Sequence, residues 1–318
     1  MIDPHVHCRD GKQAYKATIA ETIALAQEQG IDTIFDMPNT DPPILSMDDV
    51  MERLTLVPND KMEAYRLFIG ATSDENQLEE AVRCWEMFSP VIGIKMYAGQ
   101  SVGDLAIIGE DEQKFVYRKL SDLGYTGVLA VHCEKEAYML PHLWDPKHPE
   151  THSAARPKEA EIESTRDQIS FAREEGFEGT LHIVHMSCPE TTDLVQKAKP
   201  YLSITGAVTP HHLMFDTERM KRPGGLMLKM NPPLRSPKDR ERMVSYLRDG
   251  KIDWMESDHA PHASYEKMGP PYASGFPSLH MYRTCVDAFL PAQGVTPDII
   301  KAVTYWNIIR TFGHKLSR

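Results

Sequence analysis

Residues 3–9 read Asp3-Pro4-His5-Val6-His7-Cys8-Arg9, with two histidines one residue apart. Side chains alternate between the two faces of a β-strand, so His5 and His7 are expected on the same face. Two imidazoles on one face can hold a metal ion from one side. Because the pair lies near residue 1, later segments must supply the other ligands. The fold must therefore bring distant strand ends to one point.

Short apolar runs alternate with longer amphipathic stretches along the whole chain. The predicted strands cover residues 1–7, 31–37, 63–70, 91–97, 126–132, 180–186, 202–208 and 252–258. The amphipathic stretches include residues 14–29, 76–88, 113–123, 155–175, 190–198 and 237–248. Strands that alternate with helices are typical of βαβ units and a parallel sheet. Eight such units predict a (β/α)8 TIM barrel, which typically needs about 250 residues.

The alternative to a barrel is an open doubly wound sheet. Such a sheet normally carries a glycine-rich phosphate loop after its first strand, and this sequence has none there. We therefore expect residues 1–318 to form a single barrel domain of the α/β class.

Composition excludes several kinds of partner. The net charge is −11 and no basic stripe occurs, so nucleic acid is not an expected partner. No apolar run approaches the roughly 18 residues of a membrane span, and the first residues do not resemble a signal peptide. The five cysteines are scattered and form no CxxC motif, which is typical of reduced thiols. We expect a cytoplasmic protein that acts on a small molecule.

Polar residues stand at the ends of the predicted strands. They are His5, His7, Asn39, Lys95, His132, His185 and Asp258. In a barrel, parallel strands deliver such residues to one mouth, where active sites lie. A lone histidine is more often structural, but recurrence on several strands favours one site. His182, three residues before His185, is expected to face the helical layer instead.

Lys95 lies in an otherwise apolar predicted strand, residues 91–97. A buried lysine is costly unless it is paired or chemically altered. One alternative is a Schiff-base lysine, as in barrel aldolases. The other is a carbamylated lysine, which is an anion able to bridge two metal ions. The surrounding histidines favour the second, because two adjacent dications need a shared anionic ligand.

Asp258, at the end of the last predicted strand, can bind a metal ion and take a proton from a metal-activated water.

Three loops that follow predicted strands are also expected to contribute to the site. The long loops at residues 209–236 and 259–277 are expected at the same mouth. The loop at residues 98–110 follows the lysine strand and is expected to act as a lid.

Several segments together make the chain resemble the amidohydrolase superfamily and, within it, the dihydroorotase family. They are residues 5–9 (HVHCR), 37–40 (MPNT), 93–97 (GIKMY), 131–134 (VHCE), 182–187 (HIVHMS), 231–235 (NPPLR) and 257–262 (SDHAPH), with Lys267 beyond. The HxH pair is specific only to the superfamily. Arg9 and His262 together narrow the resemblance to the dihydroorotase family.

The resemblance implies a binuclear metal centre and a substrate site. One Zn²⁺ would be held by His5, His7 and Asp258, and a second by His132 and His185. N6-carboxylated Lys95 and a hydroxide would bridge the two ions. The implied residues for the substrate carboxylate are Arg9, Asn39 and His262, and Asn231 would contact the ring.

The implied reaction is the reversible cyclisation of N-carbamoyl-L-aspartate to L-dihydroorotate in de novo pyrimidine (UMP) biosynthesis. In the hydrolytic direction, hydroxide attacks the ring amide carbonyl and Asp258 passes its proton to the leaving nitrogen. The resemblance also allows a homodimer and an association with aspartate transcarbamoylase.

The chain departs from the family pattern in three places. Many relatives carry a small β-sandwich beside the barrel, and we expect a barrel-only form that lacks most of it. Cys8 stands where an aliphatic residue is usual, and Glu256 replaces a small residue before Ser257. Neither replacement removes a predicted ligand.

Three alternative functions remain open. A hydantoinase, dihydropyrimidinase or allantoinase would share the metals but not a substrate carboxylate that needs Arg9. A non-catalytic dihydroorotase-like subunit typically loses metal ligands, whereas all six positions are filled here. A Schiff-base aldolase would use Lys95 as its nucleophile.

Overall fold

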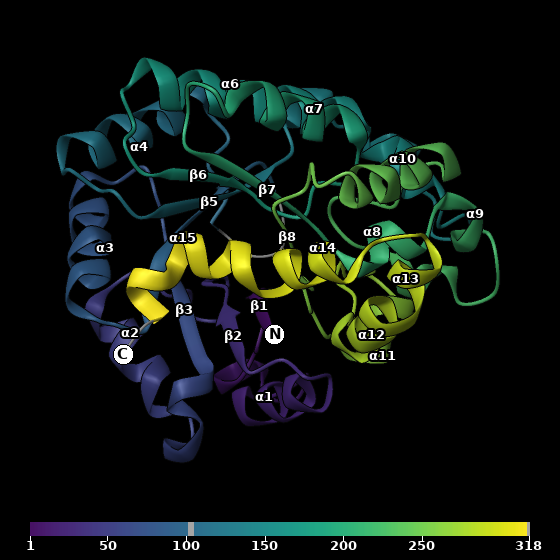
Figure 1. Cartoon of the computed structure of the whole chain (residues 1–318), viewed down its shortest axis with the longest axis horizontal. Helices are drawn as coiled ribbons and strands as arrows, with labels where there is room; N and C mark the ends of the chain where they lie inside the picture. Colours follow the sequence, from purple (N-terminus) through teal and green to yellow (C-terminus); the bar gives the residue numbers. More distant parts are fainter. Residues whose placement is uncertain (101–104, 317–318) are drawn as a thin grey trace.

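A single eight-stranded sheet forms the centre of the computed structural model, which describes residues 1–100 and 105–316. Its strands are β1 (Ile2–Val6), β2 (Thr33–Asp36), β3 (Tyr65–Gly70), β4 (Val91–Ala98), β5 (Val128–Cys133), β6 (Thr180–Ile183), β7 (Ile204–Val208) and β8 (Trp254–Met255). Strands adjacent in the chain are adjacent in the sheet, and all their pairings are parallel (Figure 1).

The segment after β8 returns to β1. Val6 and His259 form a parallel bridge, and His7 N–H donates to the His259 carbonyl at 2.8 Å. Below this bridge, Ser257 N–H donates to the Asp3 carboxylate at 2.8 Å. These contacts bring the last strand beside the first, so the predicted TIM barrel is confirmed.

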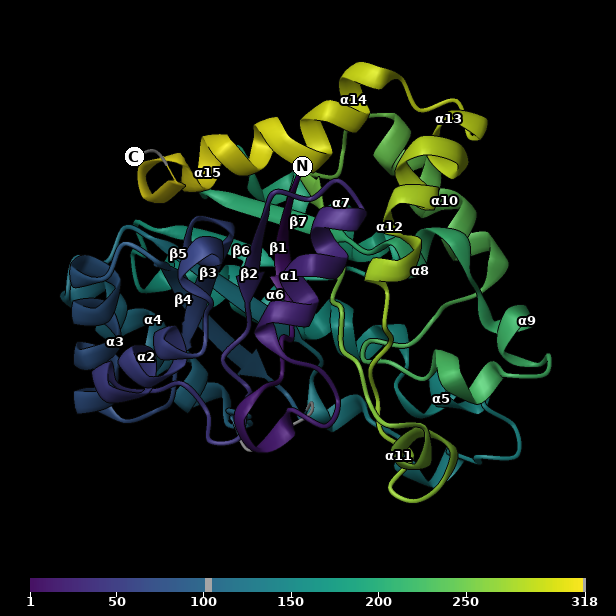
Figure 2. The ribbon, with the colours of Figure 1, turned by 90° about the horizontal axis from the view of Figure 1, so that it is seen from below.

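Helices separate the strands and lie outside the barrel (Figures 1 and 2). The longer ones that link consecutive strands are α1 (Ile19–Glu28), α2 (Met47–Thr55), α3 (Glu75–Met87), α4 (Glu110–Asp122), α6 (Lys158–Glu174), α7 (Pro189–Ala198) and α10 (Pro237–Arg248). The first helix begins at Ile19, later than predicted, because Thr18 and Glu21 form a capping box.

Short helices occupy the connections and the C-terminal region. Within the connections they are α5 (Thr151–Ala155), α8 (Pro210–Met214), α9 (Thr217–Met220) and α11 (Ser264–Met268). The C-terminal ones are α12 (Leu279–Thr284), α13 (Leu290–Ala292), α14 (Pro297–Lys301) and α15 (Asn307–Leu316). Figure 2 shows α11 and α5 at one end of the barrel and α15 at the other.

Helix α15 closes the end of the barrel that lies opposite the α11 loops. Its Phe312 ring meets Phe35, Phe68 and Trp254 at centroid distances of 5.1, 6.3 and 5.8 Å. Residues at the beginnings of β1, β4 and β5 belong to the same buried cluster. The opposite mouth, at the carboxyl ends of the strands, is left for polar side chains.

Two predicted strands end earlier than expected. The prediction placed strands over residues 180–186 and 252–258, but β6 ends at Ile183 and β8 at Met255. His185 and Asp258 have positive φ angles of 36° and 47°, which end the extended conformation.

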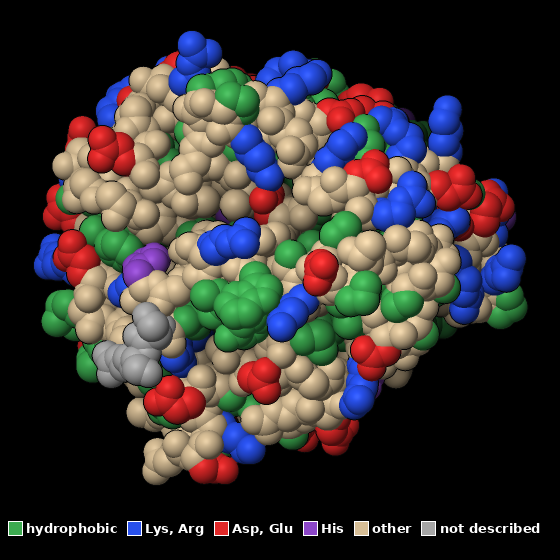
Figure 3. All heavy atoms as spheres, in the orientation of Figure 1, with side chains coloured by type: hydrophobic (Ala, Val, Ile, Leu, Met, Phe, Trp, Pro, Cys, Tyr) green, Lys and Arg blue, Asp and Glu red, His purple; other side chains and the backbone are tan. Residues whose placement is uncertain are grey.

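Other expectations are only partly covered by the described residues. The predicted lid at residues 98–110 includes residues 101–104, which lie outside them, so the lid stays a prediction. That residues 1–318 form a single domain also stays a prediction. Every named strand in the described ranges belongs to the barrel sheet. None of the described helices is both long and apolar enough to cross a membrane. Figure 3 shows acidic and basic side chains interspersed over one face.

The role of α15 can be tested by truncating Phe312, which is 1% exposed. Phe312→Ala is expected to lower the free energy of unfolding by about 3–5 kcal/mol, because the cavity would lie inside the barrel. Trp306→Ala is the matched control, since Trp306 precedes α15 and is 46% exposed; its effect should stay within about 0.5 kcal/mol. Urea unfolding measures both, and equal effects would contradict this role.

Candidate metal and substrate site

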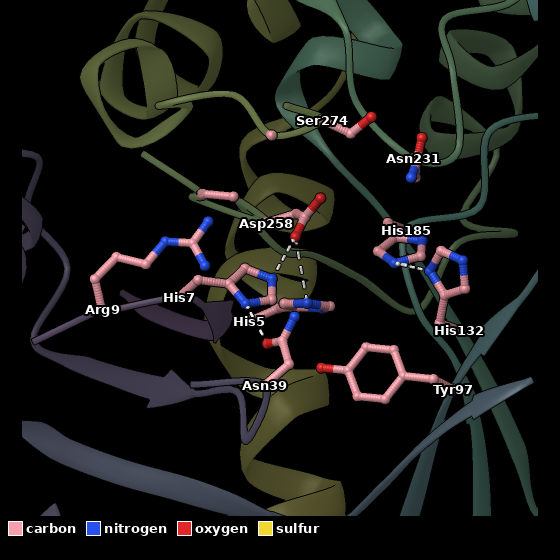
Figure 4. A pocket seen from close by; sticks show the side chains of 12 residues that line it. His5, His7, Arg9, Asn39, Tyr97, His132, His185, Asn231, Asp258 and Ser274 are labelled. Carbon is pink, nitrogen blue, oxygen red and sulfur yellow. Dashed lines mark hydrogen bonds and ion pairs between the residues drawn. The ribbon is translucent and has the colours of Figure 1, made fainter. Parts of the chain in front are cut away.

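A pocket opens at the carboxyl ends of the strands (Figure 4). It is lined by His5, His7, Arg9, Asn39, Tyr97, His132, His185, Asn231, Asp258, Ala260, Ser274 and Gly275. All predicted site residues line it except Lys95 and His262. The barrel therefore brings together predicted site residues that are up to 253 positions apart in the chain, from His5 to Asp258.

His5, His7 and Asp258 form the first candidate metal subsite. One ligand atom from each lies within 4.8 Å of the other two. The Asp258 Oδ1 atom is 3.4 Å from His5 Nε2 and 2.9 Å from His7 Nε2. Ligands of a tetrahedral Zn²⁺ ion lie about 3.3 Å from one another. The three residues therefore fit one ion.

The first two histidines are oriented through their other ring nitrogen. His5 Nδ1 lies 3.1 Å from the Glu256 carboxylate, and His7 Nδ1 lies 2.8 Å from Asn39 Oδ1. Donation from Nδ1 leaves Nε2 free to bind a metal ion. Burial lowers the pKa of His5 to about 4 despite the neighbouring carboxylates. The His5 imidazole is therefore neutral at pH 7, as a metal ligand must be.

His132 and His185 form the second candidate subsite. His132 Nδ1 and His185 Nε2 are 3.1 Å apart, which again suits two ligands of one ion. Burial lowers the pKa of both imidazoles. The Glu134 carboxylate lies 3.1 Å from His132 Nε2 and pairs with Arg156 at 2.6 Å. The His5 and His185 rings are 5.3 Å apart, so the two subsites are adjacent.

Lys95 is buried below the pocket with only 1% exposure. Its Nζ atom has no hydrogen-bond partner among the described residues and lies 4.9 Å from the centre of the Tyr97 ring. Burial lowers the pKa of Lys95 to about 8, although Glu256 and Asp258 oppose the shift. An unpaired buried ammonium is unfavourable, so burial raises the neutral fraction of this amine and favours a modified form.

Asp258 is held as an ionised carboxylate. Burial opposes ionisation, but His7 at 2.9 Å and the neighbouring His5 and His185 outweigh it and lower the pKa of Asp258. Asp258 does not cap a helix, because α11 begins only at Ser264. An ionised carboxylate at this place can bind a metal ion or accept a proton.

Arg9 supplies a buried cation on the pocket wall. It is 2% exposed, and its Nε donates to the Pro261 carbonyl at 3.1 Å. Its Nη2 lies 3.2 Å from His262 Nε2. His262 does not line the pocket; its Nε2 is also 2.9 Å from the Ser274 carbonyl oxygen. The structure thus places His262 against Arg9, outside the residues that line the pocket.

Asn231 lines the opposite part of the pocket. Its Oδ1 atom lies 3.0 Å from His152 Nε2, and α5 carries His152. The side chain of Asn231 is therefore fixed by a helix of the mouth. This position agrees with the predicted contact to the substrate ring, which stays a prediction.

Sequence reasoning missed Tyr97. Its side chain lines the pocket, is 4% exposed, and its hydroxyl has no partner among the described residues. The available signal was strand alternation, because Tyr97 is two residues from Lys95 and shares its face. Burial keeps the phenol protonated by raising the pKa of Tyr97 well above 10.

The prediction that His182 faces the helical layer was wrong. His182 points into the barrel, where its ring lies 4.3 Å from the Trp254 ring and its Nε2 lies 3.2 Å from Glu256. Alternation failed because β6 ends at Ile183 and His185 has a positive φ. Both histidines therefore reach the interior, at different depths.

Comparison with known proteins shows the family of the chain. No protein-family model matches the chain. It is 30% identical to the dihydroorotase of Methanosarcina mazei, over 98% of this chain and 69% of the relative. It is 31% identical to the dihydroorotase of Aeropyrum pernix, over 89% of this chain and 62% of the relative. The chain spans about two thirds of the length of these relatives.

Solved structures share the fold. The L-hydantoinase of Arthrobacter aurescens superposes with a TM-score of 0.83 at 21% identity, over 98% of this chain and 70% of that one. The dihydropyrimidinase of Brevibacillus agri superposes with a TM-score of 0.82 at 19% sequence identity, over 98% of this chain and 70% of that one. The fold of cyclic amide hydrolases and the identity to the curated relatives agree, and the chain belongs to the dihydroorotase family.

Proposed function

We propose that this chain is a zinc-dependent dihydroorotase that interconverts L-dihydroorotate and N-carbamoyl-L-aspartate. The observation that carries the proposal is the buried guanidinium of Arg9 beside two adjacent metal subsites. Arginine offers a planar fork that suits a carboxylate, and dihydroorotate carries one on its ring. The related hydantoinase, dihydropyrimidinase and allantoinase reactions do not need this cation.

Two Zn²⁺ ions, bridged by N6-carboxylated Lys95, would complete the site. The donor set of imidazole nitrogens and carboxylate oxygens suits zinc. The lowered pKa of Lys95 supports carboxylation, because only the neutral amine reacts with carbon dioxide. Carboxylation of Lys95 would replace an unpaired buried ammonium group by an anionic carbamate. When bound, the ions would supply a hydroxide at neutral pH and polarise the carbonyl under attack.

The side chains of the pocket would perform the remaining steps. Asp258 would accept the proton of the attacking group and pass it to the leaving ring nitrogen. Arg9 and Asn39 would bind the substrate carboxylate, and Asn231 would contact the ring. The unpaired hydroxyl of Tyr97 is placed to donate a hydrogen bond to the substrate.

The assignment of Arg9 predicts a loss of substrate affinity. Arg9→Ala should raise KM for dihydroorotate by about 100-fold or more, because the planar fork can make two buried charged hydrogen bonds, each worth about 1.5–3 kcal/mol. The zinc content should not change. Steady-state kinetics with metal analysis measure both, and normal turnover of dihydroorotate by the variant would exclude the substrate assignment.

Two controls make the Arg9 experiment specific. Lys12 follows Arg9 closely but its side chain is 71% exposed, so Lys12→Ala should leave KM unchanged. The rate of hydrolysis of 5,6-dihydrouracil, which carries no carboxylate, should not fall in Arg9→Ala. If the wild type prefers the uncharged ring, the chain is a dihydropyrimidinase-like enzyme.

The bridging role of Lys95 predicts dependence on carbon dioxide. Metal-free protein reconstituted with Zn²⁺ should regain activity with bicarbonate and much less in carbon dioxide-free buffer. Lys95→Ala should lower kcat by more than about 100-fold, because one shared anionic ligand is lost. Covalent trapping of Lys95 by borohydride in the presence of substrate would instead support a Schiff-base aldolase.

The hydroxyl of Tyr97 predicts a smaller, specific effect. Tyr97→Phe should lower kcat/KM for dihydroorotate by about 10- to 100-fold, the range of one buried hydrogen bond to a charged group. Tyr138→Phe is the control, since Tyr138 is 40% exposed. Unchanged kinetics in Tyr97→Phe would show that the hydroxyl does not contact substrate.

The homodimer and the association with aspartate transcarbamoylase that the resemblance allows stay predictions, and the cytoplasmic location stays a prediction from the composition. The alternative of a non-catalytic subunit is disfavoured by the filled ligand positions.

A further inference from the structure

We propose that Glu256 is a positioning residue that couples the two metal subsites, by holding the His5 ring and the His185 backbone in one arrangement. This inference deepens the proposed function and rests on its metal centre.

Glu256 is completely buried and both its oxygens are occupied. Oε1 lies 3.1 Å from His5 Nδ1 and accepts from His185 N–H at 2.7 Å. Oε2 lies 3.2 Å from His182 Nε2 and accepts from Trp254 Nε1–H at 3.3 Å. The contacts come from β1, β6, the segment after β6, and β8. One carboxylate therefore joins three parts of the barrel.

These contacts favour the ionised form of Glu256. An ionised carboxylate accepts only, which matches four surrounding donors. A negative charge behind His5 also makes its Nε2 a better ligand for a dication.

Glu256 acts on one ligand residue of each subsite. At His5 it fixes the tautomer, so that Nε2 faces Asp258. At His185 it holds the N–H group of a residue whose φ is 36°, a conformation that turns the ring toward His132. Such a backbone persists only where neighbours hold it. Glu256 itself does not line the pocket, so it does not touch substrate.

His182 completes the arrangement from below. Its Nδ1 lies 2.9 Å from Thr205 Oγ1, and its ring packs on Trp254. In one tautomer of His182, Nδ1 carries the proton and donates to the threonine oxygen, so Nε2 can only accept. In the other tautomer, Nδ1 accepts from the threonine hydroxyl and Nε2 donates to Glu256. The carboxylate selects the second tautomer, because Oε2 has no proton to give.

The test measures metal affinity as well as activity. Glu256→Gln keeps the size of the side chain but turns an NH₂ group toward donors. We expect the apparent affinity for Zn²⁺, from competition with a fluorescent chelator, to fall by about 10- to 100-fold, the usual effect of losing such a partner. The absorption spectrum of the Co²⁺-substituted protein should also change, because the ligand field at His5 changes.

Glu161→Gln is the matched control. Glu161 is a buried carboxylate that accepts from Ser187 N–H at 2.9 Å and lies 3.5 Å from Arg235, but it contacts no proposed metal ligand. Its loss should lower the thermal stability without changing Zn²⁺ affinity or the Co²⁺ spectrum. Equal metal effects in the two variants, or wild-type affinity in Glu256→Gln, would overturn the inference.

Two further outcomes separate this inference from the proposed function. If Glu256→Gln does not fold, Glu256→Ala takes its place, and wild-type Zn²⁺ affinity in Glu256→Ala would overturn the inference. If the wild type binds Zn²⁺ but does not open dihydroorotate, the proposed function fails. Weakened Zn²⁺ binding in Glu256→Gln would then still support the role of Glu256.

Discussion

Three residues of the site leave the strand conformation through left-handed backbone angles. Arg9, His185 and Asp258 have φ values of 62°, 36° and 47°. Such angles cost a residue other than glycine about 1–3 kcal/mol and persist only where the surroundings impose them. The Glu256 carboxylate holds His185 N–H, and the Arg53 guanidinium donates to the Arg9 carbonyl at 2.5 Å. The pocket depends on these constrained strand ends.

The same buried groups tie the site to the barrel wall. Arg53, on α2, pairs with Asp36 at 2.6 Å, and Asp36 also accepts from Tyr65 at 2.7 Å and from Cys8 N–H at 2.9 Å. A buried ion pair is tolerated when its remaining hydrogen bonds are satisfied. Burial raises the pKa of Cys8, so its thiol is neutral and packs as a small apolar group. Its unusual identity therefore leaves the support of Arg9 intact.

Hydrophobic periodicity was sufficient to predict the eight strands and their order, because both faces of barrel strands are buried and the runs stand out. The same periodicity also predicted that the histidines lie at one mouth of the barrel, because the carboxyl ends of parallel strands lie together. It failed where the backbone leaves the extended conformation: His182 was assigned to the wrong face for this reason. Glu256 was recognised only as an unusual residue, because its four partners come from distant segments. Tyr97 was overlooked within an apolar strand.

Local desolvation, rather than net charge, explains how an acidic protein could select an anion. Burial and repulsion from Arg156 lower the pKa of Lys229 to about 8, and burial and repulsion from Lys229 lower that of Lys267 to about 7. Lys267 donates to the carbonyls of Lys229 and Ala273 at 2.9 and 3.1 Å, so it braces the loop that carries Ser274 rather than reaching into the pocket. Arginine keeps its charge under the same burial. Arg9 is thus the cation on the pocket wall that a substrate carboxylate can neutralise, whatever the charge of the outer surface.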